Sequence, residues 1–271
     1  MKQYIQLTNE EIKRSFKLYV IVVLVMAAIE LVSVVAQVML HEQKIKNFME
    51  SNRATLSEAL QQIGRLDYAD TTSFFVFMTL IGIVFVVIYA FQIWYRDWLG
   101  ETKYIYRLLM LPGQRSSIFF SKLTAVFLVM ISFIGLQWCF LKFGSYLFDW
   151  SIRSEYQKSS YTNMFSSSLE EVYTSNLVNM ILIILISTMI VCLIFLLVLL
   201  ERSHRKVKGL IRVAIETTIF VSYSFICLYF LDQTHLLLSS EKDALFIGFV
   251  FVYMIYACWR SLRLLKWKIS V

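Results

Sequence analysis

Apolar residues along this chain fall into six long stretches that are separated by shorter polar segments. The stretches cover residues 18–40, 74–95, 118–141, 177–200, 213–231 and 244–262. A run of about 20 apolar residues lets an α-helix cross the hydrocarbon core of a bilayer, and the stretches are close to that length. One proline and eight glycines leave few points where these helices would break. The pattern predicts an all-α membrane protein with six transmembrane helices in a single transmembrane domain, residues 1–271.

The composition excludes a soluble globular protein of this size. Hydrophobic residues make up 58% of the chain and charged residues 17%, so too much apolar surface would face water. Most of the 26 Lys and Arg residues precede the first stretch, follow the sixth, or lie between the second and third or the fourth and fifth. Positive charge collects on the cytoplasmic side of membrane proteins. The charges therefore predict both termini in the cytoplasm and two large outer loops, at residues 41–73 and 142–176.

Both predicted outer loops contain signals for short helices. Each carries a Ser/Thr-x-x-Glu capping box, Thr55 with Glu58 in the first loop and Ser168 with Glu171 in the second. In the first loop, Leu56, Leu60 and Ile63 follow at helical spacing. This helix either packs on the membrane face or on a partner, or it belongs to a solvated hairpin that binds nothing.

The segment before the first apolar stretch, residues 5–17, is amphipathic. Thr8 and Glu11 have the spacing of another capping box. Apolar residues then share one face of the expected helix, while basic residues lie on its other faces. We expect an elbow helix that rests in the headgroup region before the chain turns into the bilayer.

The predicted cytoplasmic segment between the second and third stretches is the most informative part of the sequence. Tyr104, Leu108 and Leu111 repeat at helical spacing, and Pro112 with Gly113 would end the helix. A short amphipathic helix held between two spans is suited to transmit force, because pushing it moves both spans. Its partner would be a soluble domain with a groove. The alternative is a helix that only floats on the inner leaflet.

This segment also carries a resemblance to a known family. It reads Arg107-Leu108-Leu109-Met110-Leu111-Pro112-Gly113-Gln114-Arg115, is followed by Lys122, and has Tyr95-Arg96 and Gly100 upstream. It resembles the segment after the second helix in permease subunits of bacterial ABC-2-type ABC exporters. Those subunits often read Leu-Leu-x-Leu-Pro, then an arginine, then a lysine in the next helix. The motif covers about 30 residues, while the elbow, the six spans and the cytoplasmic termini extend the likeness in architecture.

The resemblance implies that residues 98–112 form a coupling helix that docks on a nucleotide-binding subunit. The implied contacts are Trp98, Glu101, Tyr104, Ile105, Arg107, Leu108, Leu111 and Pro112. It also implies a second permease protomer, identical or paralogous, and a location in the bacterial plasma membrane. The aromatic content of 16% and the uncharged spans favour an amphipathic or lipophilic cargo, and the resemblance suggests an antimicrobial or toxin-like peptide. The sequence has no GxxxxGK[S/T] motif, so we expect ATP and Mg²⁺ on the partner subunit and no cofactor, metal or enzyme activity on this chain.

Two acidic residues lie inside the apolar stretches. Glu30, near the middle of the first, is expected to contribute with Gln37 either to helix packing or to the substrate path, because a charged carboxylate there is costly. Glu216 lies one helical turn after Arg212, so a local ion pair is expected. An alternative to the exporter is a non-transporting sensor or immunity module that binds a ligand through its outer loops.

Overall fold

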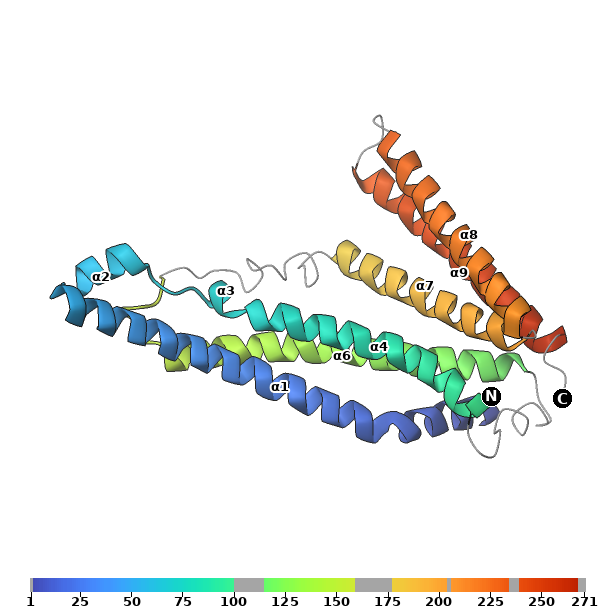
Figure 1. Cartoon of the computed structure of the whole chain (residues 1–271), viewed down its shortest axis with the longest axis horizontal. Helices are drawn as coiled ribbons and strands as arrows, with labels where there is room; N and C mark the ends of the chain where they lie inside the picture. The colour runs from blue at the N-terminus through green and yellow to red at the C-terminus, as the bar shows by residue number, and fades with distance from the viewer. Residues whose placement is uncertain (1, 100–114, 159–176, 204–205, 234–238, 268–271) are drawn as a thin grey trace. The chain divides into compact units, whose positions relative to one another are not determined.

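The structure is a computed structural model that describes residues 2–99, 115–158, 177–203, 206–233 and 239–267. These residues are mostly helical (Figure 1). The helices are α1 (Lys2–Asn52), α2 (Leu56–Ile63), α3 (Tyr68–Thr71), α4 (Ser73–Leu99), α6 (Ser116–Ser151), α7 (Leu177–Arg202), α8 (Lys206–Gln233) and α9 (Ser239–Trp267). No strand occurs among the described residues, which confirms the predicted all-α class.

The described residues include six helices that are long and apolar enough to cross a membrane: α1, α4, α6, α7, α8 and α9. Large apolar side chains on these helices stay exposed, among them Leu24, Val32 and Phe225. Such exposure is typical of surfaces that face lipid and would be unfavourable in water. The predicted number of spans is confirmed, and the chain has the make-up of a multi-pass membrane protein.

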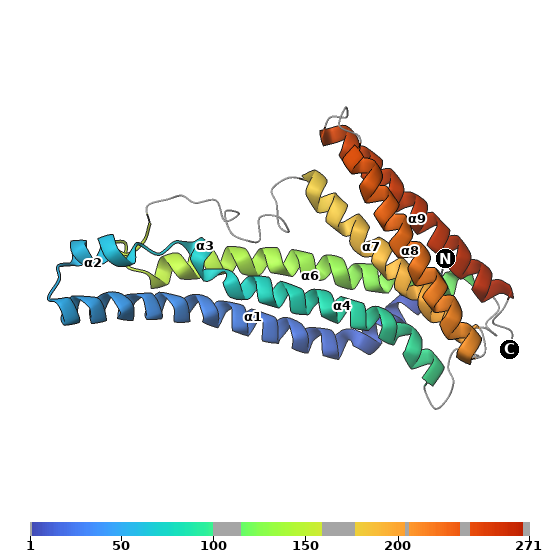
Figure 2. The ribbon, with the colours of Figure 1, turned by 45° about the horizontal axis from the view of Figure 1, so that its top comes forward.

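The chain forms two units. Unit 1 contains Met1–Arg14, Phe85–Met130 and Ile181–Val271, and unit 2 contains Ser15–Val84 and Ile131–Met180. Helices α1, α4 and α6 each contribute residues to both. In unit 1, α8 and α9 form a hairpin (Figures 1 and 2). The Tyr223 hydroxyl of α8 donates to the carbonyl of Phe249 at 2.8 Å, and Phe220 packs against Tyr253 with ring centroids 4.9 Å apart.

In unit 2, α1, α4 and α6 lie side by side (Figures 1 and 2). Their core continues into the segments predicted as outer loops, because Ile45, Ala59, Tyr68 and Phe148 belong to one buried cluster. We call α2, α3 and the ends of α1 and α6 that pack with them the loop assembly. The backbone N–H of Leu66 donates to the carbonyl of Tyr156 at 3.0 Å, which joins the two predicted outer loops. The two segments predicted as outer loops are therefore in contact with each other.

Local signals in the first outer loop are confirmed. Helix α2 begins after Thr55, whose backbone N–H donates to the Glu58 carboxylate at 2.9 Å. The capping box at Ser168 and Glu171 lies outside the described residues. Helix α1 continues past Leu40, where the loop is predicted to begin, and ends at Asn52.

The capping box predicted at Thr8 and Glu11 is wrong. Helix α1 already runs from Lys2, so Thr8 lies in the helix interior and its hydroxyl donates to the carbonyl of Tyr4 at 3.0 Å. Residues 5–17 are helical and continue into the first span without a break. Glu11 bonds to another helix, as described below.

Close packing at Gly144 of α6 generates a stability prediction. A Cβ added there would lie 2.8 Å from the Tyr68 hydroxyl oxygen and 3.1 Å from Phe75 Cζ. That hydroxyl donates to the carbonyl of Leu141 at 2.8 Å, so it cannot withdraw without losing the bond. We expect Gly144→Ala to lower the free energy of unfolding by about 1–3 kcal/mol, measured in detergent solution.

The matched control is Gly135→Ala on the same helix, where nothing lies within 4 Å of the added Cβ. It should be neutral or stabilising, because alanine favours a helix interior more than glycine does. Adding Tyr68→Phe to Gly144→Ala should cost less than the sum of the single changes. Equal loss from both alanine variants would contradict the packing described here.

Candidate functional site

A buried ammonium group organises the described ends of three helices in unit 1. Lys122 of α6 is 1% exposed. Its Nζ lies 2.7 Å from Glu11 Oε1 of α1, 2.5 Å from Asp97 Oδ2 of α4 and 2.9 Å from the carbonyl oxygen of Ile93. An ammonium group has three N–H donors, so all three are satisfied.

Each carboxylate around Lys122 also meets an arginine. The guanidinium of Arg96 donates to the second oxygen of Glu11, and Arg14 Nη1 lies 3.6 Å from Asp97 Oδ1. Glu11 and Asp97 thus each bridge the buried lysine and one partly exposed arginine. We call these five side chains the ion cluster. Three cations against two carboxylates leave it with one excess positive charge.

Aromatic rings surround the buried side of the ion cluster. Lys122 Nζ lies 5.2 Å from the centroid of the Trp94 ring, a cation–π contact. Trp94 and Phe119 both pack edge-on against Phe195 of α7, with centroid distances of 5.5 and 5.8 Å. In such surroundings an unpaired charge is very costly, while a fully paired one can fix which helices meet. The ion cluster is therefore built to hold helices in place.

The ion cluster brackets the segment at residues 100–114, which the structure does not describe. Asp97 lies in the last turn of α4, just before this segment, and Lys122 lies in the second turn of α6, just after it. Their ion pair joins the two helices at either side of the segment. Glu11 adds the first turns of α1 to the same joint.

Two further contacts tie neighbouring helix ends to this joint. Arg115, at the start of α6, donates to the carbonyl of Leu265 at 3.0 Å and to that of Lys266 at 3.4 Å, near the end of α9. Carbonyls at a helix C-terminus lack intrahelical partners, so an arginine suits them. The Tyr95 hydroxyl of α4 donates to Glu201 near the end of α7. These helix ends are among those that the charge pattern assigns to one side of the membrane.

Most of the predicted contact residues cannot be placed. Trp98 is half-buried near the end of α4. The others lie outside the described residues: Glu101, Tyr104, Ile105, Arg107, Leu108, Leu111 and Pro112.

The other two predicted site residues, Glu30 and Gln37, both lie in unit 2. Glu30 is fully buried, and its Oε1 accepts a hydrogen bond from Gln137 Nε2 of α6 at 2.7 Å. Gln37 Nε2 lies 3.4 Å from the carbonyl oxygen of Thr71, which is the last residue of α3. Both contacts join α1 to another helix.

The partner predicted for Glu216 differs from the one observed. Arg212 on the same helix was expected, but the ion pair that the structure shows is with Arg260 of α9, at 2.9 Å. The Tyr256 hydroxyl of α9 also donates to Glu216, at 2.9 Å. This bond network fastens α8 to α9 instead of stabilising α8 alone.

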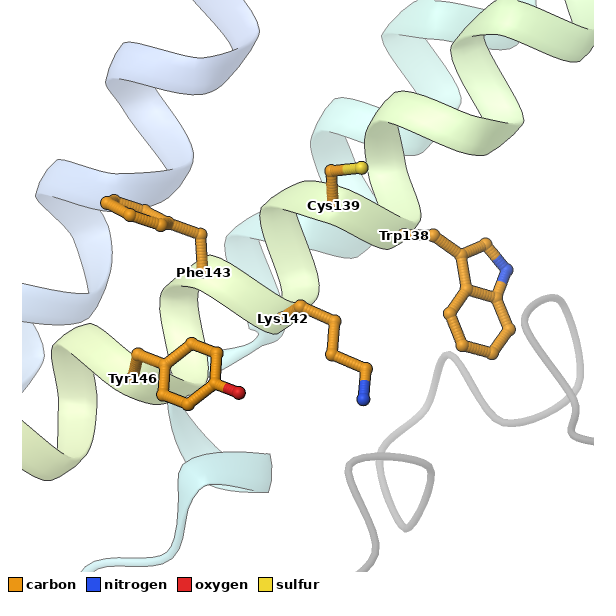
Figure 3. Close-up of a pocket in the computed structure, with 5 residues that line it drawn as sticks. All are labelled: Trp138, Cys139, Lys142, Phe143 and Tyr146. Atoms are coloured by element: carbon orange, nitrogen blue, oxygen red, sulfur yellow. The ribbon is translucent and has the colours of Figure 1, made fainter.

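An open hollow of about 310 Å³ lies along α6 in unit 2 (Figure 3). It is lined by Trp138, Cys139, Lys142, Phe143 and Tyr146. Tryptophan and tyrosine next to a lysine at the end of a span are typical of the membrane–water interface. We interpret the hollow as part of such an aromatic belt, without a set of converging polar groups.

The sequence interpretation missed the ion cluster although it noted most of its members. Glu11 was assigned to a cap, Arg96 and Lys122 were noted as part of the family motif, and Arg14 entered only through the distribution of positive charge. The available signal was Lys122 itself, which lies inside an apolar stretch and must have partners there. Its partner Glu11 is 111 positions away in the sequence, so no local pattern could name it.

Comparison of the chain with protein-family models, with curated proteins and with solved structures gave no match.

Removing the buried lysine should strongly destabilise the protein. In Lys122→Met, Glu11 and Asp97 would stay buried without their shared cation, which should cost about 3–5 kcal/mol. The measurement is unfolding in detergent solution followed by circular dichroism. Lys142→Met, which removes an exposed lysine of the same helix, is the matched control and should have little effect.

The triple variant Glu11→Gln, Asp97→Asn and Lys122→Met should recover much of that loss, because no buried charge is then left unpaired. If the single and triple variants unfold alike, the pairing described here is wrong.

Proposed function

We propose that this chain is the permease subunit of an ATP-driven bacterial exporter of the ABC-2 type. The observation that carries the proposal is the ion cluster, which joins the helices on either side of residues 100–114 and adds the start of α1. A segment that is pushed by an ATPase needs such an anchorage. Without it, the segment would move while α4 and α6 stayed in place. The resemblance of residues 107–115 to the family motif supports the same interpretation.

In this proposal, residues 98–112 dock on a separate nucleotide-binding subunit that holds ATP and Mg²⁺. Movement of that subunit pushes the segment, and the Asp97–Lys122 pair passes the displacement to α4 and α6 together. Arg115 passes part of it to the end of α9. The spans then reorient, so that the translocation path opens first to the cytoplasmic side and then to the outer side.

Two permease protomers, identical or paralogous, would enclose the path in the bacterial plasma membrane. An aromatic content of 16% and the scarcity of charge in the spans favour an amphipathic peptide or a lipophilic compound as cargo. Charged solutes would find few partners along such helices.

The second candidate is a non-transporting sensor or immunity module. The loop assembly favours it, because α2, α3 and the ends of α1 and α6 pack together in a buried cluster that continues from the spans of unit 2. A rigid assembly at the membrane surface could present a ligand site. A stable, solitary protein that binds a ligand without an ATPase would support this candidate.

Copurification tests the exporter proposal. A small ATPase with a Walker motif should copurify with the wild-type chain from its native membrane. Tyr104→Arg and Leu108→Arg should abolish the association, because a charge would replace an apolar contact in the groove of the partner. Val207→Arg, at an exposed apolar position near the start of α8, should leave it intact. Association that survives both coupling-segment variants would contradict the proposed docking mode.

The ion cluster should matter for coupling and not only for assembly. Asp97→Asn keeps the side-chain shape and weakens the pair with Lys122, so the complex should form while its ATP hydrolysis responds less to the permease. Typical coupling energies predict a loss of about tenfold, measured on the reconstituted complex. Asp149→Asn, an exposed change near the end of α6, is the control. Wild-type hydrolysis by an intact Asp97→Asn complex would exclude this role.

A further inference from the structure

The carboxyl group of Glu30 is isolated inside unit 2. Glu30 lies on α1 within the apolar stretch of residues 18–40, and its side chain is 0% exposed. It follows Leu18 by 12 positions, or about 18 Å along a helix. That distance places it well inside a hydrocarbon core of about 30 Å.

Only one of the two carboxyl oxygens of Glu30 has a hydrogen-bond partner in the part of the chain that the structure describes. Oε1 accepts from Gln137 Nε2 at 2.7 Å, while Oε2 is buried and has none. The Ser33 hydroxyl is one turn away, but it donates to the backbone carbonyl of Glu30 at 2.7 Å. It therefore does not serve the carboxyl group.

The groups that face Glu30 carry no compensating positive charge. On α3, the titratable group near it is Tyr68, whose hydroxyl donates to the carbonyl of Leu141. On α4, the buried residues of unit 2 include Phe75 and Met78, which are apolar. On α6, Gln137 is a neutral amide. Among the described residues, no lysine, arginine or histidine forms an ion pair with Glu30.

A carboxylate in this position would lack the donors that a buried negative charge requires. A carboxylate is stabilised by a nearby cation or by two to three N–H donors, and Glu30 has a single neutral donor. The contrast with Glu11 is direct, because the ion cluster surrounds that carboxylate with Lys122 and Arg96. A carboxylic acid costs less in the same geometry, because its carbonyl oxygen accepts from Gln137 and a neutral O–H at Oε2 requires no counter-ion.

We propose that Glu30 is a proton-binding site within the membrane, with the proton on Oε2 at neutral pH. Ser33 and Gln37 follow Glu30 on the same face of α1, and the side-chain amide of Gln37 donates to the backbone carbonyl of Thr71 at 3.4 Å. The proposal concerns this chain alone and does not depend on an ATPase partner.

Infrared spectroscopy of the purified chain in lipid tests the site directly. The C=O stretching band of a protonated carboxylic acid should be present at neutral pH and should be lost in Glu30→Gln, which keeps the bond partner Gln137. Glu50→Gln removes an exposed carboxyl of the same helix and should leave the band unchanged. If the protonated-carboxyl band is absent at neutral pH, or if it is the same in Glu30→Gln as in the wild type, the proposal is wrong.

A second measurement needs no variant. Dicyclohexylcarbodiimide reacts with protonated carboxyl groups in apolar surroundings, so peptide mass spectrometry of the labelled wild-type chain should find adducts at Glu30 and not at Glu50. The absence of an adduct at Glu30 would overturn the proposal.

Discussion

The burial of one lysine constrains the ends of three helices. The ammonium group of Lys122 cannot be left unpaired in an apolar environment, so Glu11 and Asp97 must be brought to it from α1 and α4. Each of these carboxylates then holds an arginine that is partly exposed. The joint thus extends from the aromatic interior of unit 1 to its surface. Everything proposed about residues 100–114 depends on this joint, because it fixes the helices from which that segment starts and to which it returns.

Other buried carboxyl groups in the chain have different hydrogen-bond and ion-pair partners. Glu216 pairs with Arg260 and fastens the α8–α9 hairpin. Glu30, in contrast, has one hydrogen-bond donor to its carboxyl group among the described residues, the neutral amide of Gln137. Apolar faces of membrane helices slide past one another at little cost, since lipid competes equally well for them. The few buried polar contacts therefore decide which helices meet and in which register, and a carboxyl without a cation is the place where a proton is expected.

The spans and their number could be predicted because the thickness of the bilayer sets the length of each apolar stretch, which can be read from that stretch alone. The cap at Thr55 and Glu58 was predictable for the same reason, since both residues belong to one turn. The pairing of Glu11 with Lys122 was not, because it joins residues far apart in the sequence and depends on tertiary packing. The cap predicted at Thr8 was wrong because α1 starts earlier, at Lys2, so that Thr8 lies in the interior of the helix. The exporter assignment itself remains a proposal from motif and geometry.

The central proposal is that an ATPase pushes on residues 98–112 and that the ion cluster anchors the helices on either side of residues 100–114. Its most direct test is photo-cross-linking in intact cells from a benzoylphenylalanine placed at position 104. The account predicts an adduct with a protein that carries a Walker motif, obtained without detergent. Adducts with lipid alone, in cells where the chain is inserted and stable, would contradict it.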